Sequence, residues 1–370
     1  MKTRRINMAE IAVGDAIPWD VYAAGGSLLV RKGHLLSSEN QCMLLLERGF
    51  IDDDREERVV VEAPSVVRLL NRAQVLLASA LAAIVNAVPF GEQLTEVARL
   101  VMAAVELDAE VAMACILLNQ HAYAYPVRHS VDTAVLALVV GRALKKGPDE
   151  LLTLVQAALT MNVGMLAEYE RLRAGGTGLN ANDTAYIRAH PQAGAALLRQ
   201  AGVDDAAWLA CVLEHHENED GSGYPSGKSG AQLSEASKIV GLADRYCARV
   251  SLRGYRKTML PNAALRDILM EGKHTVDTKL ATVFLRELGI FPTGTFVRLC
   301  DGEIGVVTRK GLNSTTPYVH ALVGPRGAPL DVPLRRDTKI ELHAIRDVLS
   351  ADQAGVVLRL DQLWGSVARA

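Results

Sequence analysis

The stretch RHSVDTAVLALVV, residues 128–140, carries apolar side chains at the spacing of a helix face. Val131, Val135 and Leu138 recur at intervals of three and four residues, which brings them to one side of an α-helix. Comparable spacing continues over residues 65–288. Proline, glycine and polar residues interrupt it in four segments, at 89–91, 146–148, 173–183 and 220–230. The sequence therefore predicts a bundle of about nine helices.

The chain before this bundle has the signals of short strands. Residues 27–30, Ser-Leu-Leu-Val, lie between Gly-Gly and Lys-Gly pairs, which is the chemistry of a hairpin. Residues 52–58 form a run of charges that favours a solvated linker or the entrance to a helix. We expect a small N-terminal α/β or β-containing module over residues 1–62.

The chain after the bundle changes pattern at the Phe-Pro-Thr-Gly sequence of residues 291–294. The segments TFVRL, GEIGVVTR and YVHALV then alternate with glycine and proline, which is typical of short antiparallel strands. We therefore predict a mainly α protein, with the helical domain over residues 63–289 and a β-rich domain over residues 290–370.

Composition excludes several classes of protein. The 370 residues include 49% hydrophobic residues, and 40 Lys and Arg balance 42 Asp and Glu. Such a chain is neither a disordered tail nor a basic protein that binds nucleic acid polymers. The five cysteines form no CxxC pair, which predicts a reducing, cytoplasmic location without disulfides. The apolar stretches are short or interrupted, so we expect no membrane insertion.

Four of the nine histidines lie at or beside predicted helix ends. They are His129, His190, His215 and His216. A lone histidine on a helix is usually a core or surface residue, but an adjacent pair followed by Glu217 is less easily explained that way. Adjacent helical side chains point about 100° apart, so both serve one centre only if it lies between them or holds two ions. Imidazole with carboxylate suits Fe, Mn, Zn or Ni. A polar helix end capped by a loop stays an alternative.

The segment HHENEDGSGYP, residues 215–225, resembles the signature of the HD-GYP family, bacterial enzymes of the HD superfamily that hydrolyse cyclic di-GMP. His129 in RHSVDTAVLA, His190 in AHPQAGAALL and Asp244 in KIVGLADRYCA stand where that family has conserved positions. The resemblance extends over residues 120–270 and keeps the order and spacing of the motifs. It implies the HD helical fold and a divalent metal site.

The resemblance also implies roles for particular residues. The metal ligands would be His129, His190, His215, His216 and Asp244. Arg253 and Arg256 resemble the segment that contacts the ligand. The recognition loop would consist of Gly221, Gly223, Tyr224 and Pro225. In the family this loop is implicated in contacts with GGDEF-type diguanylate cyclases.

The sequence departs from the family in one motif. The family run Leu-Leu-His-Asp-Ile-Gly-Lys is replaced at residues 159–165, where Met161, Asn162 and Met165 stand for the His, Asp and Lys. The glutamate that holds a third metal in some members is Tyr125. The missing aspartate bridges two metal ions in the family, and a neutral Asn162 is a poorer bridge between repelling cations. Met161 and Met165, on one predicted helix face, would fill pocket space. No catalytic residue is assigned.

The remaining ligands divide between two metal positions by resemblance. One would keep His129 and Asp244, and the other His190, His215 and His216. Three imidazoles suffice for one zinc-like ion with an open position. An empty pocket, with histidines hydrogen-bonded to each other and to Asp244, is the alternative.

Two hypotheses for function follow. The first is a degenerate HD-GYP-type pseudoenzyme of cyclic di-GMP signalling, catalytically weak or inactive, which binds the dinucleotide or a GGDEF-domain protein. The second is an active metal-dependent phosphodiesterase that hydrolyses cyclic di-GMP to pGpG or GMP with a rearranged metal site. A phosphohydrolase for another nucleotide is a third interpretation, and the sequence allows a homo-oligomer.

Overall fold

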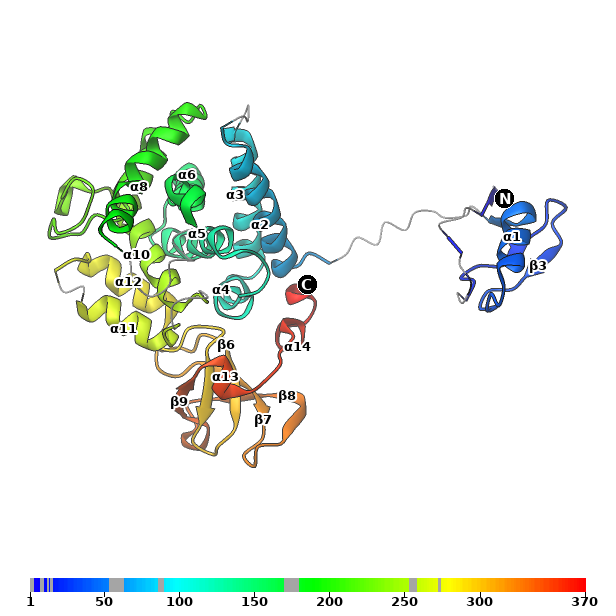
Figure 1. The fold of residues 1–370 in the computed structure, drawn as a ribbon. Coiled ribbons are helices and arrows are strands. Elements are labelled where there is room, and N and C mark those ends of the chain that lie inside the picture. Colours follow the sequence, from blue (N-terminus) through cyan, green and yellow to red (C-terminus); the bar gives the residue numbers. More distant parts are fainter. Residues whose placement is uncertain are drawn as a thin grey trace. The chain divides into compact units, whose positions relative to one another are not determined.

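The computed structural model describes residues 3–6, 10–11, 13, 16–52, 63–85, 90–169, 180–252, 258–271 and 274–370. The chain divides into two compact units, residues 1–62 and residues 63–370 (Figure 1). The predicted boundary between residues 289 and 290 stays a prediction.

The N-terminal unit contains a small antiparallel sheet. Its strand order is β1 (Thr3–Arg5), β4 (Phe50–Asp52), β2 (Val21–Tyr22) and β3 (Leu28–Val30). Strands β2 and β3 pair with each other, as the hairpin signals predict. One helix, α1 (Glu39–Arg48), precedes β4 and begins at Ser38, whose side chain accepts a hydrogen bond from the Gln41 amide.

The second unit begins with a helical bundle. The described residues between 63 and 289 form α2 (Val66–Ala83), α3 (Phe90–Leu107), α4 (Ala109–Leu118), α5 (Tyr125–Ala143), α6 (Pro148–Thr160), α8 (Ala181–Gln200), α9 (Ala206–Glu214), α10 (Glu235–Val250), α11 (Pro261–Glu271) and α12 (Thr278–Leu288). These are more than the nine predicted. One reason is Asp108, which caps α4 through the amides of Glu110 and Val111 and so separates α4 from α3 without a glycine or proline.

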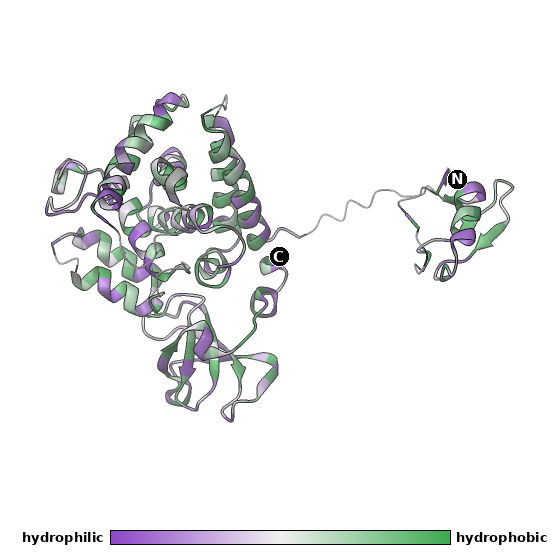
Figure 2. Cartoon of the chain, in the orientation of Figure 1, coloured by the Kyte–Doolittle hydropathy of each residue, from purple (hydrophilic) through white to green (hydrophobic). Residues whose placement is uncertain are grey.

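Helix α5 lies inside the bundle. Every position from Arg128 to Gly141 is buried, although the sequence spacing predicts only one apolar face. A helix that is buried on all sides belongs to the core of a large domain. Outer helices such as α8 carry both hydrophilic and hydrophobic residues (Figure 2). The polar residues of α5, His129 among them, are therefore enclosed by protein.

A five-stranded antiparallel sheet follows the bundle. Its order is β8 (Pro329–Asp337), β7 (Tyr318–Val323), β6 (Ile304–Arg309), β5 (Phe296–Leu299) and β9 (Ile345–Leu349). The short helices α13 (Ala351–Ala354) and α14 (Leu360–Trp364) and the 3₁₀ helix η4 (Gly365–Ala368) follow the sheet, and Ser65 donates a hydrogen bond to the Arg369 carbonyl. The predicted fold class is confirmed: a mainly α protein with a small N-terminal sheet and a β-rich C-terminal part.

One helix has the length and composition of a membrane span. Helix α2 meets that test, with 44% of its apolar window buried inside the protein. Leu70, Ala73 and Leu77 on this helix belong to the main core cluster. Core helices of globular domains pass the same test, so α2 is weak evidence for a span.

Two glycines allow the backbones that carry the histidines to meet. A Cβ at Gly164, in the 3₁₀ turn η1 (Val163–Glu168), would lie 2.3 Å from the His190 carbonyl oxygen. A Cβ at Gly241, within α10, would lie 2.3 Å from the His215 carbonyl oxygen. Real atoms do not approach so closely, so only glycine permits these contacts.

Replacement of Gly241 tests this packing. Alanine is the better helix former by about 1 kcal/mol, but in α10 its Cβ would collide with backbone. We expect Gly241→Ala to lower the free energy of unfolding by about 1–3 kcal/mol in denaturant titrations. Gly91→Ala is the matched control, because Gly91 lies in α3 with nothing within 4 Å of the added Cβ. Equal stability of the two variants would contradict the packing account.

Candidate metal centre

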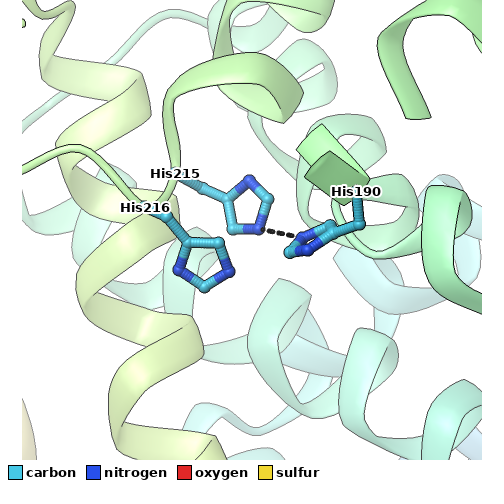
Figure 3. A group of neighbouring side chains, drawn as sticks. All are labelled: His190, His215 and His216. Atoms are coloured by element: carbon cyan, nitrogen blue, oxygen red, sulfur yellow. Dashed lines mark hydrogen bonds between the residues drawn. The ribbon is translucent and has the colours of Figure 1, made fainter. Parts of the chain in front are cut away.

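Three histidine rings converge from two helices (Figure 3). His190 lies on α8, and His215 caps the C-terminal end of α9, directly before His216. One ring nitrogen from each residue lies within 4.8 Å of the others, and the Nε2 atoms of His190 and His215 are 3.2 Å apart. The two motifs that are distant in sequence thus form one cluster.

Backbone carbonyls fix the orientation of His190 and His215. Pro191 follows His190 within α8 and has no N–H, so the Ile187 carbonyl loses its helical partner. That carbonyl lies 2.6 Å from Nδ1 of His190 and accepts its hydrogen. His215 Nδ1 donates in the same way to the Val212 carbonyl at 2.8 Å. Both rings therefore turn Nε2 toward the centre of the cluster.

This arrangement places two acceptors face to face. A neutral histidine that donates from Nδ1 has only a lone pair on Nε2. The Nε2 atoms of His190 and His215 therefore cannot hydrogen-bond to each other unless one ring is charged. Burial, with the neighbouring histidines, lowers the pKa of His190 to about 4 and that of His215 to about 3. A cation other than a proton, held between the two nitrogens, would stabilise this contact.

The cluster fits a transition-metal ion. Two nitrogens bonded to one ion at 2.0–2.1 Å lie about 3.0 Å apart in octahedral and about 3.4 Å apart in tetrahedral geometry. The observed separation of 3.2 Å lies between these values. Burial also lowers the pKa of His216 to about 4, so all three rings are in the neutral form that binds metals.

His129 and Asp244 form a second group. His129 Nε2 on α5 lies 2.7 Å from Asp244 Oδ1 on α10, and both side chains are buried. Burial alone would raise the pKa of Asp244. The hydrogen bond from His129 and the charges of His129, His216 and His215 outweigh burial and hold this pKa well below its usual range. Tyr125 stacks on His129 with ring centroids 5.2 Å apart. The carboxylate stays ionised beside the three histidines.

The replaced motif lies where α6 ends. Helix α6 stops at Thr160, Met161 is fully buried, and Asn162 is 6% exposed. Among the described residues, Asn162 Oδ1 is a buried oxygen without a hydrogen-bond partner. The expectation that Met161 and Met165 share a helix face is wrong. Helix α6 ends before Met165, which lies partly exposed in the 3₁₀ turn η1.

The loop after the paired histidines packs onto His216. A Cβ at Gly223 would lie 2.4–2.6 Å from the backbone of residues 216–218, which explains the glycine. The Tyr224 ring stacks on the His216 ring at 4.7 Å. Glu217 Oε1 accepts hydrogen bonds from the amides of Ser226 and Gly227. Glu217 thereby holds the loop that contains Gly221 and Pro225.

Sequence reasoning missed four charged residues around this loop. Glu214 pairs with Lys228 at 2.6 Å, and Arg245 donates to Asn218 at 3.0 Å. A glutamate directly before two histidines at a helix end was the available signal. Arg188 on α8 lies over the Tyr224 ring, with Cζ 4.8 Å from its centroid. The predicted ligand residues Arg253 and Arg256 lie outside the described residues.

The known proteins that resemble this chain do so over the region that contains the histidine cluster. The family model for the HD domain matches residues 104–280. The cyclic di-GMP phosphodiesterase PA4108 of Pseudomonas aeruginosa is 31% identical over 204 residues, which cover 55% of this chain and 49% of that protein. The cyclic di-GMP phosphodiesterase PdeB of Borreliella burgdorferi is 24% identical over 200 residues, covering 54% and 52%. The chain thus spans about half the length of these relatives.

Two further proteins resemble this chain. A 3′3′-cGAMP-specific phosphodiesterase of Vibrio cholerae is 28% identical over 170 residues, covering 45% of this chain and 36% of that protein. Among solved structures, the HDG"Y"P protein Bd1817 of Bdellovibrio bacteriovorus has 15% identity and a TM-score of 0.46, covering 76% of this chain and 98% of that one. The match of the family model shows that residues 104–280 contain an HD domain, and the relatives that resemble this region are named as cyclic dinucleotide phosphodiesterases.

Proposed function

We propose that this protein binds cyclic di-GMP at a single-metal centre and hydrolyses it weakly or not at all. The observation that carries the proposal is the pair Met161 and Asn162, which places a buried thioether and a neutral amide where the family has a histidine and a bridging aspartate. The protein would act in cyclic di-GMP signalling as a degenerate member of its family.

The metal would be held by His190, His215 and His216. Their facing nitrogens and neutral state support this assignment. A bound Fe, Mn, Zn or Ni ion would supply positive charge for a phosphate group and lower the pKa of a coordinated water. Cyclic di-GMP as ligand follows from the names of the curated relatives.

Loss of the bridging charge supports weak hydrolysis. Two divalent ions a few ångströms apart repel each other strongly in a protein interior, and a shared carboxylate offsets part of that repulsion. Asn162 offers only a neutral oxygen, and Met161 brings no ligand that a hard or borderline ion prefers. The second ion would therefore bind poorly, which removes most of the catalysis.

The active enzyme is the second candidate. Asn162 Oδ1 is buried without a partner in the described part of the chain, and the His129–Asp244 pair lies on the neighbouring helices. These atoms are the ones that a rearranged second site would use. A cyclic dinucleotide other than cyclic di-GMP is consistent with the same centre, since a relative from Vibrio cholerae is named for 3′3′-cGAMP.

The loop around Tyr224 supports a further part of the proposal. Lys228 ties it to Glu214 at the end of α9, and Glu217 holds it through the Ser226 and Gly227 amides, so it presents a fixed surface beside the proposed metal centre. We propose this surface as the contact for a GGDEF-domain protein. The cytoplasmic location and a homo-oligomeric state stay predictions.

Restoration of the motif tests the proposed inactivity. We expect the wild-type chain, loaded anaerobically with Mn(II) or Fe(II), to bind cyclic di-GMP with little turnover. The double variant Met161→His with Asn162→Asp should hydrolyse it at least about tenfold faster, a gain of about 1.4 kcal/mol in transition-state stabilisation. His215→Ala in the double variant is the control and should abolish the gain. Wild-type turnover equal to that of the double variant would support the active enzyme instead.

The stability of the metal-free protein should depend on pH. The folded-state pKa values of His190, His215 and His216 lie at about 4, 3 and 4, below the ordinary 6.5. The unfolded chain therefore takes up protons first, and the stabilisation present above pH 6.5 is lost as the pH falls toward about 4. Urea titrations in a chelator should show this decrease. His216→Gln should make it shallower, and a flat profile in the wild type would contradict the assigned neutral cluster.

A further inference from the structure

Arg188 is linked to the metal centre through one aromatic ring. The Tyr224 ring stacks on His216 at 4.7 Å, and the guanidinium carbon of Arg188 lies 4.8 Å from the centroid of the same ring. An arginine over a tyrosine face is attracted by the ring quadrupole. The contact therefore holds a positive charge at the edge of the centre.

No carboxylate among the described residues forms an ion pair with Arg188, whose side chain is exposed. The neighbouring cations differ in this respect. Lys228 is paired with Glu214, and Arg245 donates to the Gly241 carbonyl and to Asn218. Arg188 thus combines a charge that has no carboxylate partner among the described residues with a place over the Tyr224 ring, which stacks on His216.

We propose that Arg188 binds a phosphate of the cyclic dinucleotide. The proposal rests on the proposed function, because it names a binding residue for the same site. A guanidinium offers five N–H donors in a planar fork that matches phosphate oxygens. Contact with the Tyr224 face leaves the edges of the fork, which carry the donors, available to a ligand. Ordering by the ring also reduces the rotamer entropy lost on binding.

Arg188 would act on the ligand and not on the metal. A guanidinium group offers hydrogen-bond donors and no acceptor, so it does not serve as a metal ligand. Substitution of Arg188 should therefore leave the metal content of the protein unchanged while it weakens dinucleotide binding. This separation distinguishes a phosphate contact from general damage to the site.

The test is calorimetric titration of cyclic di-GMP into the full, Mn(II)-loaded chain. We expect Arg188→Ala to raise the Kd about tenfold to a hundredfold, as is typical when a hydrogen bond to a charged group is lost. Arg188→Lys keeps the charge but lacks the forked donors, so its Kd should lie between those of wild type and Arg188→Ala. Added salt should weaken wild-type binding more steeply than binding by Arg188→Ala. Arg199→Ala, an exposed arginine near the end of the same helix, is the matched control and should bind like wild type.

The outcomes separate this inference from the proposed function. If wild type binds and Arg188→Ala binds equally well, the phosphate contact is wrong and the proposed function stands. If Arg188→Ala loses affinity and metal together, Arg188 supports the fold of the site and the contact is again wrong. If wild type itself fails to bind cyclic di-GMP, both the proposed function and this inference are wrong.

Discussion

The centre depends on two ring nitrogens that face each other as acceptors. Pro191 leaves the Ile187 carbonyl without a helical partner, that carbonyl takes the Nδ1 hydrogen of His190, and Val212 does the same for His215. The two Nε2 lone pairs are then 3.2 Å apart in a buried site where neither ring is readily protonated. A metal ion held between the two nitrogens would convert this repulsion into attraction. The glycines at 164 and 241 let the helices come close enough to hold the arrangement.

The same geometry underlies the difference that we propose between the two metal positions. The three-histidine cluster depends on α8 and α9, which the substitutions at the end of α6 leave in place. The neighbouring position has His129 and Asp244 already joined by a short hydrogen bond, with Asn162 in place of a charged bridge. On the proposed function, a single ion beside a phosphate-binding arginine would suit the protein to bind a cyclic dinucleotide rather than to cleave it.

Much of this could be predicted from the sequence. Helical spacing predicted the bundle, and alternation predicted the C-terminal strands, because both patterns follow from burial of one face. The histidines were found from adjacent motifs, since His215, His216 and the glycine loop are continuous in the chain. The end of α6 at Thr160 was not predicted, because no glycine or proline stands at residues 159–162 to mark it. Arg188 was missed because an exposed arginine on a polar helix face carries no signal until the Tyr224 ring is placed beneath it.

The number of metal ions per chain tests the central claim most directly. Electron paramagnetic resonance of the Mn(II)-loaded full chain, with elemental analysis of the same sample, distinguishes an isolated ion from a coupled pair. We predict about one ion per chain and the six-line spectrum of isolated Mn(II). Both the bound ion and this spectrum should be lost in His215→Ala. Two ions per chain with the broad spectrum of a coupled pair would contradict this prediction, because Asn162 would then support the bridge that we infer to be missing.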